Sequence, residues 1–548
     1  MYINRKEPSP KTHSRQFVSG VLVLSCSTVL VKIIGLVYKI PMLSLLGAEG
    51  MGYFNSAYEI YALFCIIATV GLPSAVSILV SRANVNNKND DAVYNVFKSA
   101  MRISLFVGVL GTAILFLFSE EISLLVGNSV ASSCVMAIAP SLLFVCVSGA
   151  YRGYFQGKNC MYPTAISQII EVVGKLIFGL TLAYMALKSG HDVPTTAAYA
   201  TAGLSLAMFC SAFYLVLQKK IKERKTIISK VLKNSYVGEV AKIAIPITLS
   251  SLVMGITKII DMTLILRRLQ GIGFELSAAN RMYGAYTTLA VPVFSLIPSL
   301  IAPISLALVP GLSAAIERNN KCEQSEIGSN AMRLTIILAL PSSLGIVAFS
   351  KQILNLLFLS EKDNVAFAAP LLSVLGASVF FSCIITTTNA ILHSYKKTLR
   401  PIIAMFFGAF IKLISGYFLI GDKFIGILGA PISTLLCDSV VAIINLISVI
   451  KYIPELKNTI SALWRSFVSA AISILAALAM YFLIIYKFNA EFFGFLSAVI
   501  TAVIFYFVFI FITKALTIKD IENLPMGEKI SVFIKKSGIK KGGGENDY

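Results

Sequence analysis

The chain has 548 residues, of which 57% are hydrophobic and only 14% are charged, and its mean hydropathy is +0.80. A soluble protein of this length would need several domains with polar surfaces, and there is too little polar material to cover them. The net charge of +20 would suggest nucleic acid as the partner of a soluble protein. In a membrane protein the same charge is explained by basic loops, so no nucleic-acid partner is predicted.

Apolar segments long enough to cross a bilayer recur along the whole chain, because a spanning helix needs about 20 mostly apolar residues. Clusters of charged residues, Pro, Gly and Asn separate them. The predicted spans are 17–44, 53–82, 92–118, 130–156, 162–188, 194–218, 237–266, 279–314, 327–349, 366–395, 400–420, 425–450, 462–486 and 490–514. The predicted fold class is therefore all-α, a polytopic membrane protein with about 14 transmembrane helices.

The basic residues predict how the chain is oriented in the membrane. If the N-terminus is cytoplasmic, the loops on its side hold most of the Lys and Arg residues, which is the positive-inside pattern. Both termini are then cytoplasmic, and the protein is a multi-pass protein of the cell membrane. The basic cluster in 219–236 is interpreted as an orientation signal that touches anionic lipid headgroups. The first apolar segment runs on to Pro41 without a small-residue cleavage site, so no removable signal peptide is predicted.

The basic cluster also separates two similar halves. V-K-I-I-G at 31–35 in the first span is echoed by T-K-I-I-D at 257–261 in the seventh. Transporters built from repeats place the substrate site between the repeats and rock one against the other. The predicted organisation is an N-terminal lobe (1–218), a cytoplasmic basic linker (219–236), a C-terminal lobe (237–451), two additional helices (452–514) and a basic cytoplasmic tail (515–548).

No pattern in the sequence indicates a metal, a cofactor or hydrolytic chemistry. The nine cysteines are scattered singly, mostly in apolar runs, and are interpreted as packing residues. The three histidines form no H-E-x-x-H pattern, and there is no P-loop. We therefore predict that the protein is not an enzyme.

Charged side chains inside the predicted spans are the main functional signal, because an ionised group at mid-bilayer costs about 2.5–3.5 kcal/mol on insertion scales. Lys32 and Lys39 lie seven residues apart on one face of the first span, with no acid between them. We predict that both line a substrate cavity. The alternative for Lys39 is that its side chain reaches the outer membrane surface.

Two acid–lysine spacings predict pairs within single spans. Lys258 and Asp261 are three residues apart and could neutralise one another. Alternatively, Lys258 contacts substrate and Asp261 holds a coupling ion. Glu171 and Lys175 have the favourable acid-first spacing of four and predict a structural pair.

The arginines lie near span ends. Arg281 begins the eighth span on the outer side, close to Arg267 and Arg268, where anchoring at the interface would explain any one of them. Arg82 and Arg152 sit at cytoplasmic ends and are interpreted first as anchors, with Arg82 kept as a candidate substrate contact.

The balance of charge favours an anionic substrate. Cations outnumber the carboxylates on the faces that could line a cavity. The main carboxylates there are Glu59, Asp261 and Asp438, and Glu59 is a candidate substrate-site residue. A pathway for cationic drugs would show the reverse. A diphosphate fits better, since Lys offers a compact charge and Arg a bidentate fork. With the cytoplasm negative, each negative charge carried outward gains about 2.3 kcal/mol per 100 mV.

Several stretches, taken in order, resemble the multidrug/oligosaccharidyl-lipid/polysaccharide (MOP) exporter superfamily. They are K-I-I-G-L-V-Y-K-I-P (32–41), L-L-G-A-E-G-M-G-Y-F (45–54), G-L-P-S-A-V-S (71–77), R-G-Y-F-Q-G (152–157), P-T-A-I-S-Q-I-I-E (163–171), N-R-M-Y-G-A-Y (280–286) and L-V-P-G-L-S (308–313). These motifs cover the first eight spans, and the last six match chiefly in hydropathy. The pattern is most similar to the branch that contains stage V sporulation protein B and the MurJ-type lipid II flippases.

The resemblance implies a fourteen-helix, V-shaped carrier of the bacterial cell membrane that works by alternating access. Its substrate would be a lipid-linked saccharide on undecaprenyl diphosphate, such as the peptidoglycan precursor lipid II. The cell-wall synthesis machinery is a further partner that the resemblance implies.

The resemblance also implies roles for particular residues. In the flippases, basic residues on helices one, two and eight line the cavity and hold the diphosphate, and by motif the first falls on Lys32 and the helix-eight arginine on Arg281. A second helix-one arginine would fall on Tyr38, with Lys39 adjacent as in the sporulation branch.

Some relatives bind sodium through acids on helices seven and eleven. Asp261 matches the first of these, whereas span eleven offers Lys412 and no acid. The sequence therefore leaves Na⁺, H⁺ or the membrane potential open as the source of coupling.

Three other classes of protein compete with this reading. A multidrug antiporter of the same superfamily is disfavoured by the two lysines of the first span. A membrane glycosyltransferase or polymerase acting on the same lipid would need a large external loop with acidic metal ligands, and the external loops are short. A non-transporting scaffold gives no reason for lysines in spans. Which glycan is carried, for the vegetative wall, the spore cortex or another polymer, stays open.

Overall fold

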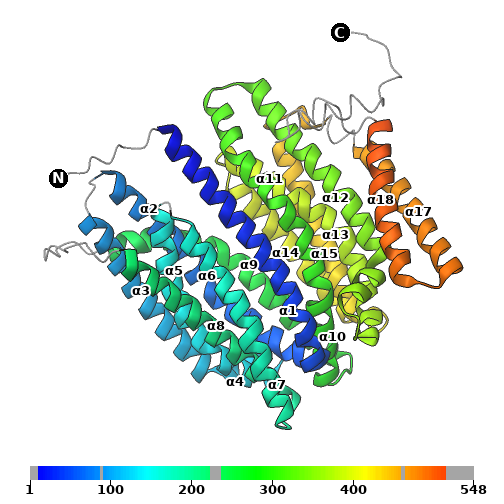
Figure 1. Cartoon of the computed structure of the whole chain (residues 1–548), viewed down its shortest axis with the longest axis horizontal. Coiled ribbons are helices and arrows are strands. Elements are labelled where there is room, and N and C mark those ends of the chain that lie inside the picture. Colours follow the sequence, from blue (N-terminus) through cyan, green and yellow to red (C-terminus); the bar gives the residue numbers. More distant parts are fainter. Residues whose placement is uncertain (1–9, 87–89, 159, 223–235, 458–462, 514–548) are drawn as a thin grey trace. The chain divides into compact units, whose positions relative to one another are not determined.

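The computed structural model describes residues 10–86, 90–158, 160–222, 236–457 and 463–513, and every regular element among them is a helix (Figure 1). The helices are α1 (Pro10–Ile66), α2 (Leu72–Asn86), α3 (Asp90–Leu117), α4 (Ser119–Val126), α5 (Ser132–Gly157), α6 (Tyr162–Gly174), α7 (Leu180–Lys188), α8 (Val193–Lys222), α9 (Val237–Gly271), α10 (Leu276–Ala285), α11 (Val291–Glu317), α12 (Lys321–Leu357), α13 (Lys362–Ser394), α14 (Leu399–Ile420), α15 (Gly429–Ile450), α17 (Leu463–Phe488) and α18 (Glu491–Ile512).

Shorter turns of other helical types join some of these helices. Three are π-helical, namely η1 (Ile67–Gly71), η3 (Lys175–Gly179) and η4 (Tyr286–Ala290), and two are 3₁₀ turns, η2 (Ser129–Ala131) and η5 (Gly426–Leu428). A π turn inserts one residue into an α-helix and shifts its hydrogen-bond register, and such turns are frequent at functional sites. The hydropathy pattern gave no sign of them.

The described residues contain 12 helical segments that are long and apolar enough to cross a membrane, which confirms the prediction of a polytopic all-α membrane protein. Helix is found at every one of the predicted spans. The count is lower than predicted for two reasons. The segment Leu30–Ala83 holds the first two predicted spans as one helical run, and α9, which covers the seventh, is not among the 12.

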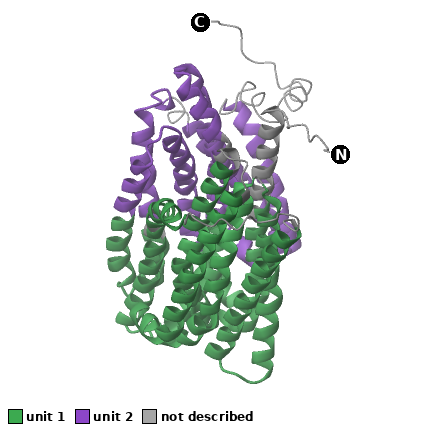
Figure 2. Cartoon of the chain, turned by 90° about the vertical axis from the view of Figure 1, so that its left-hand side faces the viewer, with its two compact units in different colours: residues 1–296, 357–371, 409–434 green, residues 297–356, 372–408, 435–548 purple. Residues whose placement is uncertain are grey.

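The chain forms two compact units (Figure 2). Unit 1 comprises residues 1–296, 357–371 and 409–434, and unit 2 comprises 297–356, 372–408 and 435–548. Unit 1 thus joins residues of the predicted N-terminal lobe to parts of the predicted C-terminal lobe. The lobe boundaries stay a prediction, and the predicted linker 219–236 and tail 515–548 lie almost wholly outside the described residues.

Each unit has its own apolar core. In unit 1, Val76 of α2, Val96 of α3 and Tyr154 of α5 belong to one buried cluster. In unit 2, Leu312 of α11 and Met332 of α12 belong to another. The helices α17 and α18 lie side by side in unit 2 (Figure 1), with Ala477 and Ala498 buried. The predicted substrate-binding and ion-coupling residues all lie in unit 1.

Candidate functional site

Helix α1 brings three of the candidate residues together because it contains a break. Gly47 has a φ of 66°, a left-handed conformation that separates the first two predicted spans. Lys32 and Lys39 precede this break, and Glu59 follows it. The three side chains can therefore meet although 27 residues separate the first from the last in sequence.

Glu59 lies among lysines from two helices. The ammonium of Lys258 on α9 is 4.0 Å from its carboxylate, and Lys39 also experiences its negative charge. Lys258 is in turn close enough to Lys32 for the two positive charges to repel one another. The Lys258 side chain is 66% exposed, which makes this ion pair weak. The cations of α1 and α9 therefore exceed the acid that neutralises them.

Lys39 is directed inward and does not reach the outer surface, so that alternative is wrong. Its ammonium donates a hydrogen bond of 2.8 Å to the carbonyl oxygen of Thr287 in η4. The π turn gives a physical reason, because a shifted hydrogen-bond register makes a carbonyl available to an outside donor. Tyr38, where the resemblance would place an arginine, is buried and packs against Phe54.

Asp261 pairs with another helix, so the predicted pair between Lys258 and Asp261 is wrong. Its carboxylate is 2.8 Å from the ammonium of Lys412 on α14, and these side chains are 20% and 15% exposed. Residues three apart on a helix point about 60° away from each other. Here Lys258 pairs with α1, whereas Asp261 pairs with α14.

We call Lys32, Lys39, Lys258, Lys412, Glu59 and Asp261 the cationic cluster. Its parts are connected through α9, on which Lys258 and Asp261 are three residues apart. Four lysines face two carboxylates, so the cluster has a net positive charge. Asp438, the third carboxylate noted in the sequence, lies in unit 2 and accepts a hydrogen bond of 2.6 Å from Ser378.

The Lys412 ammonium predicts independence from sodium. It occupies a position beside Asp261 that a sodium ion would otherwise need. Only an ion that binds the native state stabilises it. Replacing NaCl by KCl should therefore change the melting temperature of the purified protein by no more than about 1 °C. The Lys412→Ala variant, with its carboxylate uncompensated, should in contrast be stabilised by sodium over potassium. A sodium-specific stabilisation of the parent protein would contradict the prediction.

The three arginines that the sequence predicts on the outer side differ in what they contact. Arg267 donates to the carbonyl of Leu125 at 2.7 Å, and Arg268 donates to the carbonyl of Tyr417 at 3.1 Å. Arg281 is exposed, with no hydrogen bond or ion pair to the part of the chain that the structure describes. Arg281 is thus the arginine of this group whose donors are not used by another described residue. Arg82 is likewise exposed at the other end of its span.

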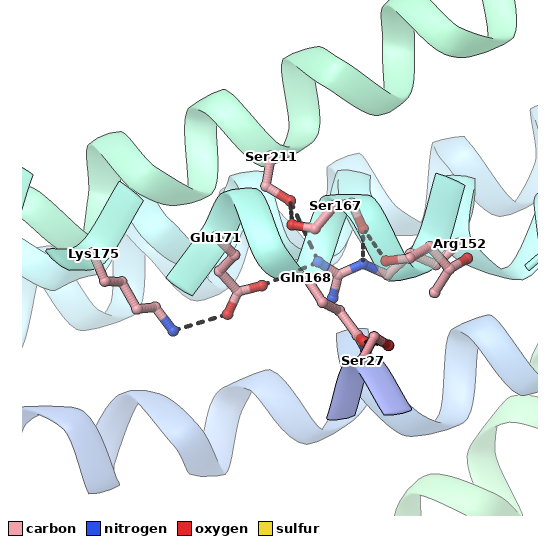
Figure 3. Close-up of polar contacts among 8 residues, drawn as sticks. Ser27, Arg152, Ser167, Gln168, Glu171, Lys175 and Ser211 are labelled. Atoms are coloured by element: carbon pink, nitrogen blue, oxygen red, sulfur yellow. Dashed lines mark hydrogen bonds and ion pairs between the residues drawn. The ribbon is translucent and has the colours of Figure 1, made fainter. Parts of the chain in front are cut away.

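A second charged group, the Glu171 network, lies inside unit 1 (Figure 3). Arg152 of α5 donates to one carboxylate oxygen of Glu171 at 3.0 Å, and Lys175 donates to the other at 2.8 Å. This confirms the predicted pair of Glu171 and Lys175. It also corrects the reading of Arg152 as an interface anchor, because its side chain is only 13% exposed and also bonds the hydroxyls of Ser167 and Ser211.

The sequence analysis missed a set of buried amides and hydroxyls next to the cationic cluster. Asn55 bonds to Thr287 and Thr288, and Asn128 bonds to Asn280. The available signal was the presence of Asn within apolar spans, where a polar group must find a partner. The predicted site contains only charged residues, so these positions are not part of it.

The 12 membrane-length helical segments of the described residues define a multi-pass membrane protein. Residues 17–316 match the family described as "Polysaccharide biosynthesis protein", and residues 283–418 match the family described as "MatE". The first match covers more than half of the 548 residues. The chain therefore belongs to the polysaccharide biosynthesis protein family, within the MOP superfamily that the sequence resembles.

Characterised relatives agree with this assignment. The chain is 27% identical over 423 residues to the lipid II flippase MurJ of Bacillus subtilis (strain 168), covering 73% of this chain and 77% of that protein. It is 22% identical over 448 residues to stage V sporulation protein B of the same organism, covering 80% of this chain and 84% of that one. The first of these relatives is a flippase by name.

Solved structures of two related kinds share the fold. A lipid II flippase MurJ in an inward closed conformation aligns with a TM-score of 0.68 and 16% identity, over 89% of this chain and 98% of that one. An inward-facing multidrug resistance MATE family transporter aligns with a TM-score of 0.60 and 16% identity, over 79% of this chain and 99% of that one. At such identities the likeness concerns the fold.

Proposed function

We propose that this protein is a flippase that moves an undecaprenyl-diphosphate-linked saccharide, such as the peptidoglycan precursor lipid II, from the inner to the outer leaflet. The observation that carries the proposal is the excess of lysines over carboxylates in the cationic cluster. A diphosphate supplies the negative charge that such a cluster lacks, and Lys32 and Arg281 are exposed to receive it.

The relatives support the same substrate class. One of them is named a lipid II flippase and another a stage V sporulation protein, which connects this branch to wall synthesis and to sporulation. With both termini in the cytoplasm, the membrane potential would favour outward movement of an anionic headgroup. Proteins of the cell-wall synthesis machinery would then receive the product. A drug antiporter is less compatible with the sign of the cluster.

The proposal is tested in cells whose only copy of the gene is the variant. Lys32→Ala and Arg281→Ala should each lower the lipid II accessible on the outer leaflet at least about tenfold, because a charge-assisted hydrogen bond to phosphate contributes about 1.5–3 kcal/mol. Lys32→Arg should retain most of the signal, and Lys188→Ala, at an exposed lysine outside the cluster, should be unaffected. The site would be refuted if both alanine variants showed normal protein abundance and normal surface lipid II. The function would be refuted if surface lipid II were unchanged after depletion of the gene.

A further inference from the structure

The helices α1 and α10 lie side by side in unit 1 and touch through their backbones (Figure 1). The contact is made at Gly52 and Gly284. A Cβ atom at Gly284 would overlap the carbonyl oxygen of Ala48, and one at Gly52 would overlap the carbonyl oxygen of Asn280. Only glycine permits so close an approach. In the predicted topology this crossing lies toward the outer face.

Neutral amides hold the outer end of the crossing. Asn128, which precedes η2, donates to the side-chain oxygen of Asn280 at 2.7 Å, and Asn280 donates back at 3.1 Å. The Asn128 amide also donates to the hydroxyl of Ser56 on α1 at 2.9 Å. All three side chains are buried. Net contributions of such neutral bonds are small, so the set can be made and broken without a large barrier.

Lys39 is the charged member of this contact surface. Its ammonium binds the Thr287 carbonyl in η4, and the Thr287 hydroxyl accepts a bond of 3.0 Å from Asn55. Asn55 also donates to Thr288 at 2.9 Å. On α1, Asn55 is one helical turn before Glu59 of the cationic cluster. The turn η4 directly follows α10, and the α1–α10 contact is taken to include it. Lys39 therefore belongs both to the cationic cluster and to this contact.

We propose that the α1–α10 contact is an outer gate and that Lys39 couples headgroup binding to its opening. In the absence of ligand, the bond from Lys39 to Thr287 keeps the gate closed. A diphosphate bound at the cationic cluster draws the Lys39 ammonium away from the carbonyl, and the gate loosens. The identity of the ligand in this inference rests on the proposed function. The latch formed by Lys39 and Thr287 is independent of that function.

The direction of the effect follows from bond strengths. A phosphate oxygen carries a full negative charge and a carbonyl oxygen only a partial one, so an ammonium is attracted more strongly to phosphate than to a carbonyl. A phosphate within reach therefore competes well for an ammonium held by a carbonyl. A ligand shifts a conformational equilibrium only by its difference in affinity for the two states. Here that difference arises because Lys39 is free to bind phosphate only when the latch is open.

Two exposed serines provide a reporter of gate closure. The hydroxyls of Ser44 on α1 and Ser360, just before α13, are 3.2 Å apart, and both lie in unit 1. Met282 of α10 lines one pocket with Ala366 and Phe367 of α13, so Ser360 lies on the α10 side of the contact. We would replace both by cysteine in a full-length protein whose nine native cysteines have been removed. The rate of disulfide formation under mild oxidation then measures how often the gate is closed.

The latch is tested without ligand. Lys39→Met should slow cross-linking, because losing a hydrogen bond from a charged group, about 1.5–3 kcal/mol, lowers the ratio of closed to open protein at least about tenfold. Lys39→Arg, which keeps a donor, should cross-link at the parental rate, and so should Lys188→Met at an exposed lysine of α7. Cross-linking of Lys39→Met at the parental rate would overturn the latch.

The coupling is tested with undecaprenyl diphosphate, using uncharged undecaprenol as the control lipid. The diphosphate should slow cross-linking of the parent, because release of the Lys39 bond lowers the ratio of closed to open protein at least about tenfold. Undecaprenol should have no effect. Lys39→Met should still bind the diphosphate through Lys32 and Lys258, yet its cross-linking should not respond. If the diphosphate binds the parent without slowing cross-linking, or slows the variant equally, Lys39 does not couple binding to the gate.

These outcomes also separate the two proposals. If the parent binds no undecaprenyl diphosphate, the proposed substrate is wrong and the coupling falls with it, while the latch is judged on the ligand-free rates. If the parent binds the lipid and flips it but Lys39→Met behaves as the parent in both measurements, the function stands and the role of Lys39 is wrong.

Discussion

Replacing Glu171 with alanine is expected to leave little folded protein after extraction in a mild detergent. Glu171 is held between Arg152 and Lys175, and the three side chains are only 17%, 13% and 14% exposed. Without the carboxylate, two cations remain close together inside unit 1. Removing one partner of a buried ion pair costs about 3–5 kcal/mol, a large part of the usual 5–15 kcal/mol of a folded domain. The measurement is the yield of monodisperse protein by size-exclusion chromatography, with its melting temperature.

A neutral triple variant separates charge from packing. In Arg152→Met/Glu171→Leu/Lys175→Met the charges are gone together, and stability should recover, since apolar groups of similar volume can replace a buried ionic triad at little cost. The neighbouring hydroxyls keep main-chain acceptors, because Ser211 donates to the Ser167 carbonyl at 2.9 Å. Glu120→Ala, at an exposed acid of α4, is the matched control. A Glu171→Ala protein as stable as this control would show that the network does not support the fold.

The fold class could be predicted because it depends on an average property. Each span needs only a long apolar run, and no single residue decides it. The Glu171–Lys175 pair was predictable for a related reason, as both partners lie on one helix and their spacing fixes their distance.

Contacts between helices could not be predicted in the same way. Asp261 and Lys412 are 151 residues apart, and no local pattern shows that α9 and α14 turn these side chains toward one another. The same limit explains why Arg152 was taken for an anchor. Its position near a span end is visible in the sequence, whereas the rotation of α5 toward α6 is not.

The π turns are the other feature that hydropathy does not encode. Each of two π turns contains a polar residue of the site. The turn η3 begins at Lys175, and η4 contains Thr287. A π turn costs regular hydrogen bonding, so it persists where surrounding contacts compensate for the shifted register. In η4 one of these contacts is the Lys39 ammonium. The candidate lysines were therefore visible in the sequence, but the position that one of them takes was not.

Gly284→Ala is expected to prevent closure of the α1–α10 contact. The added methyl group would overlap the Ala48 carbonyl and lie 2.6 Å from the Gly52 amide nitrogen, so the two backbones would have to separate. Separation would lengthen the bonds from Asn55 and Lys39 to η4 together. Losing about two net hydrogen bonds corresponds to a more than tenfold fall in the ratio of closed to open protein, measured as a slower rate of Ser44–Ser360 cross-linking in the double-cysteine protein.

The control for this variant lies on one of the same two helices. Gly35 on α1 has no atom within 4 Å of where its Cβ would be, so Gly35→Ala should cross-link at the parental rate. Alanine favours a helix over glycine by about 1 kcal/mol at either position, and this gain should keep both variants folded. A fall in cross-linking limited to Gly284→Ala must then come from the crossing itself. Parental cross-linking in Gly284→Ala would mean that the two helices can separate without opening the path between Ser44 and Ser360, and the α1–α10 contact would not be the gate.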